Sequence, residues 1–285
     1  AMRDQATLTA SEALETLLVA HNHRGMRDVR ATLEPGYLLR AADMIHGCTG
    51  RAYILTGFPV AGTFETDGPA GAMALYQLLQ QRGAEPTILS DRPIAHALST
   101  DFLCTELATG TRGEIADAVS LLYQQAPPDL VISIERPGAA ADGHCYNMAG
   151  DDISAACSSA EPYLELATCP TIAIGDGGNE LGMGKAQAAL RSLDIRAAIS
   201  DCDELIVADV SNWAAYALCA LVQWLDNKLN DPALDIQQAL AYLVAVGAVD
   251  GVTGLPTPTE DGFPANAGPH LLAEANTILT RTAAA

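Results

Sequence analysis

The sequence predicts an α/β fold: a three-layer, mostly parallel open sheet of the Rossmann-like type, with helices on both faces. Short apolar segments rich in β-branched residues alternate with longer segments whose apolar residues recur at helical spacing. The first strand, helix and strand fit within about 40 residues, the length of a parallel crossover unit. The chain contains no internal repeat and no low-complexity linker, so we expect one domain over residues 1–285.

The first half of the chain supplies one helix and then this crossover unit. A Thr/Ser start followed by leucines on one face predicts a helix over residues 9–20, and a loop follows it. The segments 51–55 and 86–90 have the composition of strands. Between them, a helix over 70–83 begins behind Pro69 and closes at a glycine.

The second half continues the alternation of helices and strands. In order, we expect a helix over 111–126, a strand over 129–138, two helical pieces over 151–167, a strand and glycine-rich turn entering a helix over 170–186, a strand over 204–210, and helices over 213–229 and 233–249. From Gly251 onward, residues rich in Gly, Pro and Thr predict a long surface loop before a short final helix.

Charge and composition argue against several classes of protein. The chain has 15 basic and 35 acidic residues and a net charge of −20, which repels nucleic-acid phosphates and anionic lipids. No apolar run is long enough to span a membrane and no secretory signal is evident, so we expect a cytoplasmic protein with no membrane or nucleic-acid partner. The 7 cysteines are scattered without a CxxC pair, which argues against structural zinc and a disulfide scaffold.

Functional residues are expected where the strands end, because ligands of open parallel sheets bind beyond the carboxyl ends of the strands. The first exit carries Thr56 and Gly57, and then Glu65 and Asp67 ahead of Pro69. Its glycines and helix start suit an anion, whereas the two carboxylates oppose one. A structural alternative is that Asp67 merely caps the helix that follows.

The second exit is Glu135-Arg136, followed by a polar loop that contains His144 and Asn147. A charged pair at the end of an apolar strand is either a surface salt bridge or an acid beside a carboxylate-binding arginine. The polar loop favours the second interpretation. His144 alone is more typical of a solvated loop histidine.

The third exit, residues 175–185, carries the strongest signal. Glycines allow a ligand to approach the backbone, and the charged and amide side chains around them are Asp176, Asn179, Glu180 and Lys185. A dinucleotide fingerprint fails because glutamate stands at position 180, and a mononucleotide phosphate loop fails because asparagine stands at position 179. A tight turn that only brings helix and strand together is the structural alternative.

The fourth exit is Asp250-Gly251, which alone indicates a turn. We expect all four segments to meet over one edge of the sheet.

With these segments the chain resembles the D-glutamate cyclase family. The resemblance rests on TGFPV with ETDGPAGA, SIERPG with DGHCYNM, GDGGNELGMGK, and AVDGVTG, and it spans roughly residues 8–284. It implies ring closure of D-glutamate to 5-oxo-D-proline with loss of water, which makes the protein a hydro-lyase acting on a small acidic amino acid.

Such a reaction needs groups that hold two carboxylates, remove protons from an ammonium and assist a departing hydroxyl. Arg136 and the N–H groups of Gly177 and Gly178 would bind a substrate carboxylate, and Lys185 would stabilise the developing oxyanion. Glu135 or Asp176 would accept the amine proton, and Glu65 or Asp67 would act as the acid. Further substrate contacts are expected from Thr56, Gly57, Asn147, Asn179, Glu180 and Asp250.

No cofactor is required by this chemistry, although the same oxygens could hold Mg²⁺ or Mn²⁺; we expect no obligatory metal. The alternatives are a nucleotide-dependent α/β enzyme that binds phosphates at the glycine turns, and a non-catalytic protein that binds an acidic amino acid. A homo-oligomer is compatible with the sequence.

Overall fold

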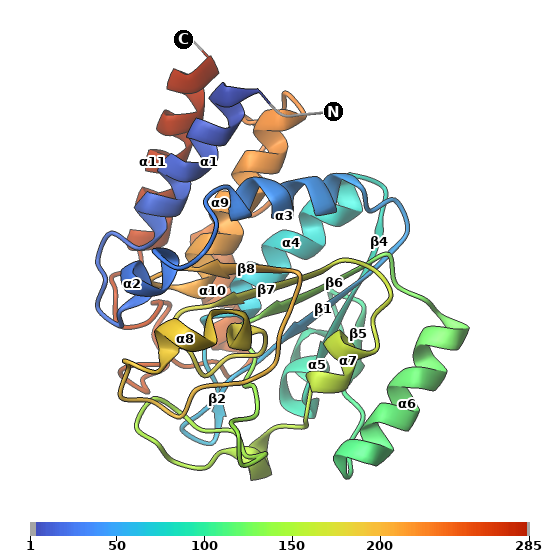
Figure 1. Cartoon of the computed structure of the whole chain (residues 1–285). Coiled ribbons are helices and arrows are strands. Elements are labelled where there is room, and N and C mark those ends of the chain that lie inside the picture. Colours follow the sequence, from blue (N-terminus) through green and yellow to red (C-terminus); the bar gives the residue numbers. More distant parts are fainter. Residues whose placement is uncertain (1–3, 284–285) are drawn as a thin grey trace.

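Six parallel strands form the central sheet of the protein (Figure 1). The computed structural model describes residues 4–283. The sheet has the order β5-β4-β1-β6-β7-β8, and a two-stranded antiparallel ribbon of β2 and β3 follows β1. The strands are β1 (Arg51–Thr56), β2 (Pro59–Val60), β3 (Thr63–Phe64), β4 (Glu85–Ser90), β5 (Cys104–Glu106), β6 (Leu130–Ile134), β7 (Thr171–Gly175) and β8 (Glu204–Val207).

The strand order confirms the predicted fold class and locates its ligand-binding position. The chain proceeds outward from β1 to β4 and β5, returns, and continues on the other side with β6, β7 and β8. Strands β1 and β6 are hydrogen-bonded neighbours, and the order reverses between them. In doubly wound sheets of this kind, the crevice outside the carboxyl ends of the strands at the reversal point is where ligands bind.

Both faces of the sheet are buried, as a parallel sheet requires. Successive residues of a strand point to opposite faces, so Ile132 packs into one hydrophobic core and Val131 into the other. One core contains α1 (Gln5–Leu18), α3 (Tyr37–His46), α4 (Pro69–Gln81), α9 (Ser211–Leu225), α10 (Ile236–Ala245) and α11 (Ala267–Ala283). The other contains α2 (Met26–Arg30), α6 (Arg112–Gln125), α7 (Glu161–Glu165) and α8 (Gln187–Leu190). Helix α5 (Arg92–Leu98) contacts the edge strands β4 and β5. Figure 1 shows α1, α3, α4, α9 and α11 above the sheet and α6, α7 and α8 below it.

Helices α4 and α9 pack against each other and both begin near the reversal point. Gly71 permits this close packing, because a Cβ at that position would lie 2.9 Å from the Cβ of Ala215. The amino ends of both helices therefore lie together beside the carboxyl ends of β1 and β6, where they expose partly positive N–H groups.

The predicted elements are confirmed at the strands and at the long apolar helices, and differ elsewhere. The expected loop between residues 20 and 51 contains α2 and α3; Gly36, with φ of 91°, makes the turn that its sequence indicates, but a helix follows at once. Helix α5 and strand β5 were not expected. The segment 151–167 is helical only in a 3₁₀ turn at Ser154–Ala156 and in α7.

The final helix α11 is not short, because it runs for 17 residues. Its residues Leu271, Ala275 and Leu279 recur at intervals of four and pack into the larger core. The many polar residues between them conceal this stripe in the sequence.

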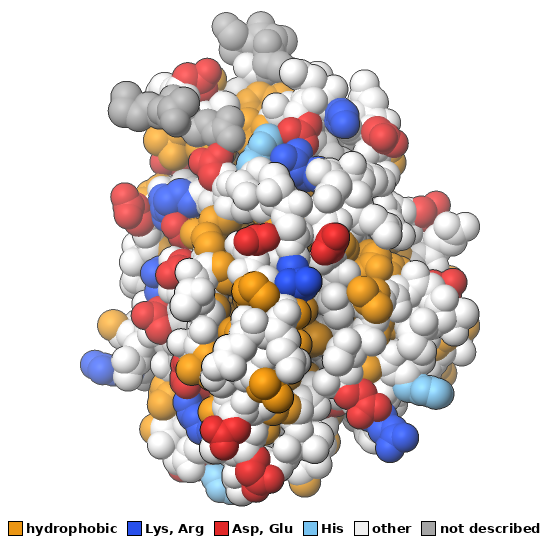
Figure 2. Space-filling model, turned by 90° about the vertical axis from the view of Figure 1, so that its right-hand side faces the viewer, with side chains coloured by type: hydrophobic (Ala, Val, Ile, Leu, Met, Phe, Trp, Pro, Cys, Tyr) orange, Lys and Arg blue, Asp and Glu red, His pale blue; other side chains and the backbone are white. Residues whose placement is uncertain are grey.

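Within residues 4–283, no helix is both long enough and apolar enough to cross a membrane. On the face shown in Figure 2, acidic, basic and hydrophobic side chains are interspersed, and the described basic side chains form no continuous patch.

Candidate functional site

A cleft of about 660 Å³ opens at the carboxyl ends of β1 and β6. All four predicted strand exits contribute to it, together with a loop near the amino terminus and one near residue 261. Its polar lining residues are Arg24, Thr63, Glu65, Glu135, Asn147, Asp176, Asn179 and Asp261; Phe58, Val60, Met148, Ile153, Gly251 and Val252 are among the other lining residues. The expectation that the four segments meet is therefore confirmed.

Backbone hydrogen bonds bring the first and fourth exits together. Glu65 and Val249 form an isolated parallel bridge, and the N–H of Thr66 donates to the carbonyl of Val249 at 2.9 Å. The N–H of Glu65 donates to the carbonyl of Phe58 at 3.2 Å. These contacts fix the backbone on which the Glu65 side chain enters the cleft.

The second and third exits are joined in the same way. Pro137 and Glu180 form an antiparallel bridge, and the N–H of Gly138 donates to the carbonyl of Asn179 at 3.0 Å. The Asn179 side chain donates from Nδ2 to the carbonyl of Tyr146 at 2.9 Å. The glycine-rich turn and the polar loop after β6 thus form one wall of the cleft.

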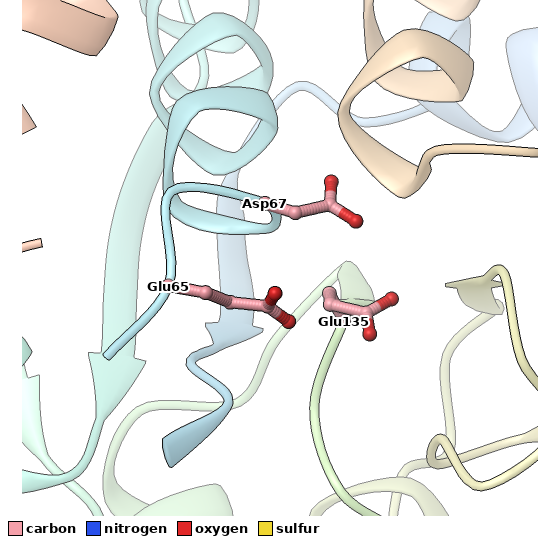
Figure 3. A group of neighbouring side chains, drawn as sticks. All are labelled: Glu65, Asp67 and Glu135. Atoms are coloured by element: carbon pink, nitrogen blue, oxygen red, sulfur yellow. The ribbon is translucent and has the colours of Figure 1, made fainter. Parts of the chain in front are cut away.

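Six buried carboxylates cluster at this point. They form three overlapping groups in which one oxygen from each residue lies within 4.8 Å of the others: Glu65, Asp67 and Glu135; Asp67, Asp176 and Asp261; and Glu135, Asp176 and Glu180. Figure 3 shows the Glu65 side chain reaching toward Glu135, with Asp67 above the gap between them. Like charges this close repel strongly when buried.

The amino end of α9 holds Asp67. The N–H of Asn212 donates to Asp67 Oδ1 at 2.8 Å, and the N–H of Ser211 reaches Oδ2 at 3.4 Å. Ser211 also donates from its N–H to Asp176 Oδ2 at 3.2 Å and from Oγ to Glu135 Oε2 at 2.6 Å. The helix end therefore orients three carboxylates and offsets part of their charge.

Asp67 does not cap α4, the helix that follows it. Asn212 does so instead: its Oδ1 accepts from the N–H groups of Gly68 at 2.7 Å and Gly71 at 2.8 Å. The alternative interpretation, in which Asp67 caps α4, is therefore wrong.

Glu180 occupies the glycine-rich turn. Its carboxylate accepts hydrogen bonds from the N–H groups of Asp176, Gly177, Gly178 and Asn179 at 2.7 to 3.0 Å. The expectation that the N–H groups of Gly177 and Gly178 bind a substrate carboxylate is corrected, because the carboxylate bound there belongs to the chain itself.

Glu135 has a backbone φ of 46°, in the left-handed region that a residue with a side chain rarely adopts. Gly68 makes room for it, since a Cβ on Gly68 would lie 2.9 Å from the Cβ of Glu135. Such strain is concentrated at functional sites, where the surrounding structure maintains it.

Arg24, which the sequence did not single out, is the cation of the cleft. It is the only lysine or arginine among the described lining residues. Its guanidinium forms ion pairs with Asp176 at 3.5 Å and with Asp261, and donates to the carbonyl of Asp209 at 3.0 Å. The only sequence signal was the basic run HNHRG in a predicted loop of a strongly acidic chain.

The two cations that the sequence did indicate lie elsewhere. The exposed Lys185 donates from Nζ to the carbonyl of Cys202 at 3.3 Å and does not line the cleft. Arg136 is fully buried, where it pairs with Asp91 at 2.5 Å and donates to the carbonyl of Ser158 at 2.6 Å. Its guanidinium holds the segments around the cleft together. The structure therefore corrects the expected contact of Arg136 with a substrate carboxylate and the expected role of Lys185 at the developing oxyanion.

Of the remaining predicted residues, one lines the cleft and the others stabilise the segments around it. Asn147 lines the cleft, and its Nδ2 donates to Asp151 at 3.1 Å. Thr56 Oγ1 donates to the carbonyl of Ile134 at 2.9 Å, and Gly57 has a φ of 113°. Asp250 accepts from the N–H groups of Val252, Thr253 and Gly262 and from the Thr259 hydroxyl, so it organises its own loop.

Burial and mutual repulsion change the acidity of the cluster. Burial raises the pKa of the Glu65, Asp67 and Glu135 carboxyls well above their ordinary values, and neighbouring carboxylates add to the shift. Burial also raises the pKa of Asp176, and Arg24 opposes that shift. The pKa of Glu180 rises to about 7 through burial and the charge of Asp176, against the effect of its backbone N–H donors.

Two comparisons show which known proteins the chain resembles. A family model described as D-glutamate cyclase-like, C-terminal, matches residues 14–276. The human protein named D-glutamate cyclase, mitochondrial, is 35% identical over 196 residues, which are 59% of this chain and 32% of the human protein. The match thus covers about a third of that longer relative.

Proposed function

Because the chain belongs to the D-glutamate cyclase-like family, matching the model of its C-terminal region over residues 14–276, we propose that it converts D-glutamate to 5-oxo-D-proline and water. The observation that carries the proposal is a cleft at the reversal point of the sheet in which buried carboxylates face one arginine. The name of the human relative includes "mitochondrial", so a cytoplasmic location stays a prediction from sequence.

The cleft offers complementary charges to a small amino acid with two carboxylates. Arg24 can pair with a substrate carboxylate, since guanidinium binds carboxylate through two parallel hydrogen bonds. Glu135 and Asp176 also line the cleft and can bind the ammonium. The apolar side chains of Phe58 and Met148 also line the cleft and can cover the methylene carbons of the substrate.

The reaction balances without a further reactant. The α-nitrogen forms a bond to the γ-carboxyl carbon, and one C–O bond of that carboxyl breaks. The ammonium loses two protons, and the departing oxygen leaves with two protons as water. Catalysis therefore requires a base near the nitrogen and an electrophile or acid near the γ-carboxyl.

In our proposal Asp176 or Glu135 accepts the ammonium proton, because both line the cleft and both are held by Ser211. Glu65 assists the γ-carboxyl. Of the two acids that the sequence offered for this step, Glu65 lines the cleft, whereas Asp67 does not and is held by the end of α9.

Two features argue against the nucleotide-dependent alternative. The N–H groups that would bind phosphate already hold Glu180. The surrounding carboxylates would also repel phosphate oxygens. No observation on the described residues favours a nucleotide over an amino acid.

The test is incubation of the purified protein with D-glutamate and, separately, with L-glutamate, followed by chiral chromatography and mass spectrometry. We expect loss of one water from D-glutamate, in the absence of nucleotide, and a turnover number at least about 100-fold lower in Glu135→Gln. Glu204→Gln, altered at the amino end of β8 and far from the cleft, is the matched control and should retain activity. Binding of D-glutamate without product would instead identify an amino-acid-binding protein, and dependence on ATP would favour the nucleotide alternative.

A further inference from the structure

We infer that Asp209 is a positioning residue for Arg24: it holds the loop of residues 19–25 against the start of α9 and so keeps the guanidinium in the cleft. Asp209 itself does not line the cleft. Its role toward the substrate rests on the proposed function, whereas its hold on the loop does not.

The loop that carries Arg24 connects α1 to α2 and lies outside the sheet. Asn22 in this loop has a φ of 54°, in the left-handed region that costs energy for a residue with a side chain. A backbone bond within the loop, from the N–H of Gly25 to the carbonyl of Asn22, is long at 3.4 Å. Contacts with the rest of the protein must therefore hold Arg24 in the cleft.

The side chain of Asp209 binds two successive N–H groups of this loop. Its Oδ2 accepts from the N–H of His21 at 2.8 Å, and its Oδ1 accepts from the N–H of Asn22 at 2.9 Å. Successive N–H groups of this kind form a concavity that binds an anion. The His23 ring lies 3.9 Å from Oδ1, beyond hydrogen-bond distance. Only 1% of Asp209 is exposed, so water cannot easily replace its bonds to the loop.

The main chain of Asp209 contacts the same stretch of chain on either side of these bonds. Its N–H donates to the carbonyl of Leu18 at 2.7 Å, and its carbonyl accepts from Nη1 of Arg24 at 3.0 Å. One residue thus holds the chain from the end of α1 to the guanidinium. The guanidinium has further N–H donors that can bind a substrate carboxylate.

The connection from β8 to α9 also holds the acidic side of the cleft. Ser211 lies two residues beyond Asp209 and donates from its N–H to Asp176 at 3.2 Å and from Oγ to Glu135 at 2.6 Å. This one segment therefore fixes Arg24 relative to the carboxylates that can bind an ammonium. A substrate that carries both a carboxylate and an ammonium needs these partners at a fixed separation.

Aromatic packing gives the loop a second attachment. The centroid of the His21 ring lies 5.8 Å from that of Trp213 at the start of α9, and 4.9 Å from that of Phe263. Loss of the Asp209 bonds should therefore loosen the loop without unfolding the protein. We expect the main effect to be on the position of Arg24.

Asp209→Asn keeps the size of the side chain but presents an amide group to one of the two N–H donors. We expect the KM for D-glutamate to rise at least about 10-fold and kcat to change less than about 3-fold, since Arg24 binds a carboxylate alike in the ground and transition states. In an Arg24→Met background, the same change should raise KM less than about 2-fold, because Asp209 acts through Arg24. Asp203→Asn is the matched control: its carboxylate accepts the N–H of Thr171 at 2.9 Å, at the amino end of β7, and its KM should equal that of the wild type.

Hydrogen–deuterium exchange followed by mass spectrometry measures the hold on the loop directly. The N–H groups of residues 19–25 should exchange at least about 10-fold faster in Asp209→Asn than in the wild type, whereas those of β1 should exchange at the same rate. Circular dichroism checks that each variant is folded. If Asp209→Asn does not fold, Asp209→Glu, which keeps the charge but displaces it by one methylene group, takes its place with the same expected results.

A folded Asp209→Asn variant with the KM of the wild type would overturn the inference. So would effects of Asp209→Asn and Arg24→Met on KM that multiply in the double variant, because the two residues would then act independently. Absence of D-glutamate turnover in the wild type would instead refute the proposed cyclase activity. In that case, faster exchange of residues 19–25 in Asp209→Asn supports the hold of Asp209 on the loop, and unchanged exchange refutes it.

Discussion

Glu65 and Gly251 share one small space. Glu65 Oε2 lies where the Cβ of any larger residue at position 251 would have to be. Gly251 does not have a left-handed backbone. Glycine is therefore needed at this position because it has no side chain, and not because of its backbone conformation. The Asp-Gly turn after α10 therefore positions a carboxylate of the first exit.

Gly251→Ala should displace the Glu65 carboxylate without straining the backbone at position 251. We expect D-glutamate turnover to fall at least about 10-fold, because the carboxylate that assists the γ-carboxyl group leaves its position. Gly113→Ala in α6 is the control, since the nearest atom to its new Cβ is Thr111 Oγ1 at 3.9 Å. Steady-state kinetics of both variants measure the effect. Equal behaviour of the two alanine variants would contradict the positioning role of Gly251.

Arg24→Met should raise the KM for D-glutamate by about 100-fold or more, because loss of one partner of a buried charge pair costs about 3 kcal/mol. An interaction made equally in the ground and transition states affects KM more than kcat. Steady-state kinetics test this, with Arg27→Met as the control because Arg27 is exposed on α2. A KM unchanged in Arg24→Met would remove this arginine from substrate binding.

Sequence alone predicted the location of the site because of one geometric rule. Parallel strands end at a common edge, so Glu65, Glu135 and Asp176 could be grouped although they are far apart in the chain. The end of each strand was also visible in the sequence, where apolar residues give way to glycine and charged residues. That rule requires only the strand positions, which hydrophobic patterning gives well.

The sequence could not predict the charge balance of the site. Arg24 and Asp261 lie in loops that pack at the amino end of α9, where His21 and Phe263 contact Trp213. No strand pattern reveals such loops. The glycine-rich turn posed a different problem. Its N–H groups bind an anion, as predicted, but a sequence cannot show that the anion is Glu180 of the same turn.

Asn212→Ala should destabilise the protein by removing the cap of α4 and a hydrogen-bond donor to the buried Glu260. Asn212 is fully buried, caps α4 through Gly68 and Gly71, and donates from Nδ2 to Glu260 at 2.8 Å. Removing it leaves these groups without partners, which should lower the free energy of unfolding by roughly 2–4 kcal/mol. Thr111→Ala removes an exposed cap of α6 and should cost about 1 kcal/mol. Urea unfolding measures both, and equal losses would show that the Asn212 contacts contribute little.

Glu260 should make the stability of the protein depend on pH near neutrality. Burial raises its pKa from 4.5 to about 7, although Asn212 and Tyr216 donate to its carboxylate. Between these two values the folded protein retains a proton that the unfolded chain has released. Unfolding then releases a proton, so the free energy of unfolding falls as the pH rises through this window.

The fall that is due to Glu260 is about 3 kcal/mol across the window, at about 1.4 kcal/mol per pH unit. Glu260→Gln resembles the protonated form at every pH and should lose this part of the dependence. The other buried carboxylates whose pKa is raised act in the same direction, so the wild-type curve is steeper than one group would make it. Urea unfolding of both proteins at about pH 5 and about pH 7.5 should therefore show the variant gaining stability relative to wild type as the pH rises. A constant difference between the two proteins would mean that Glu260 is already ionised in the folded state at the lower pH.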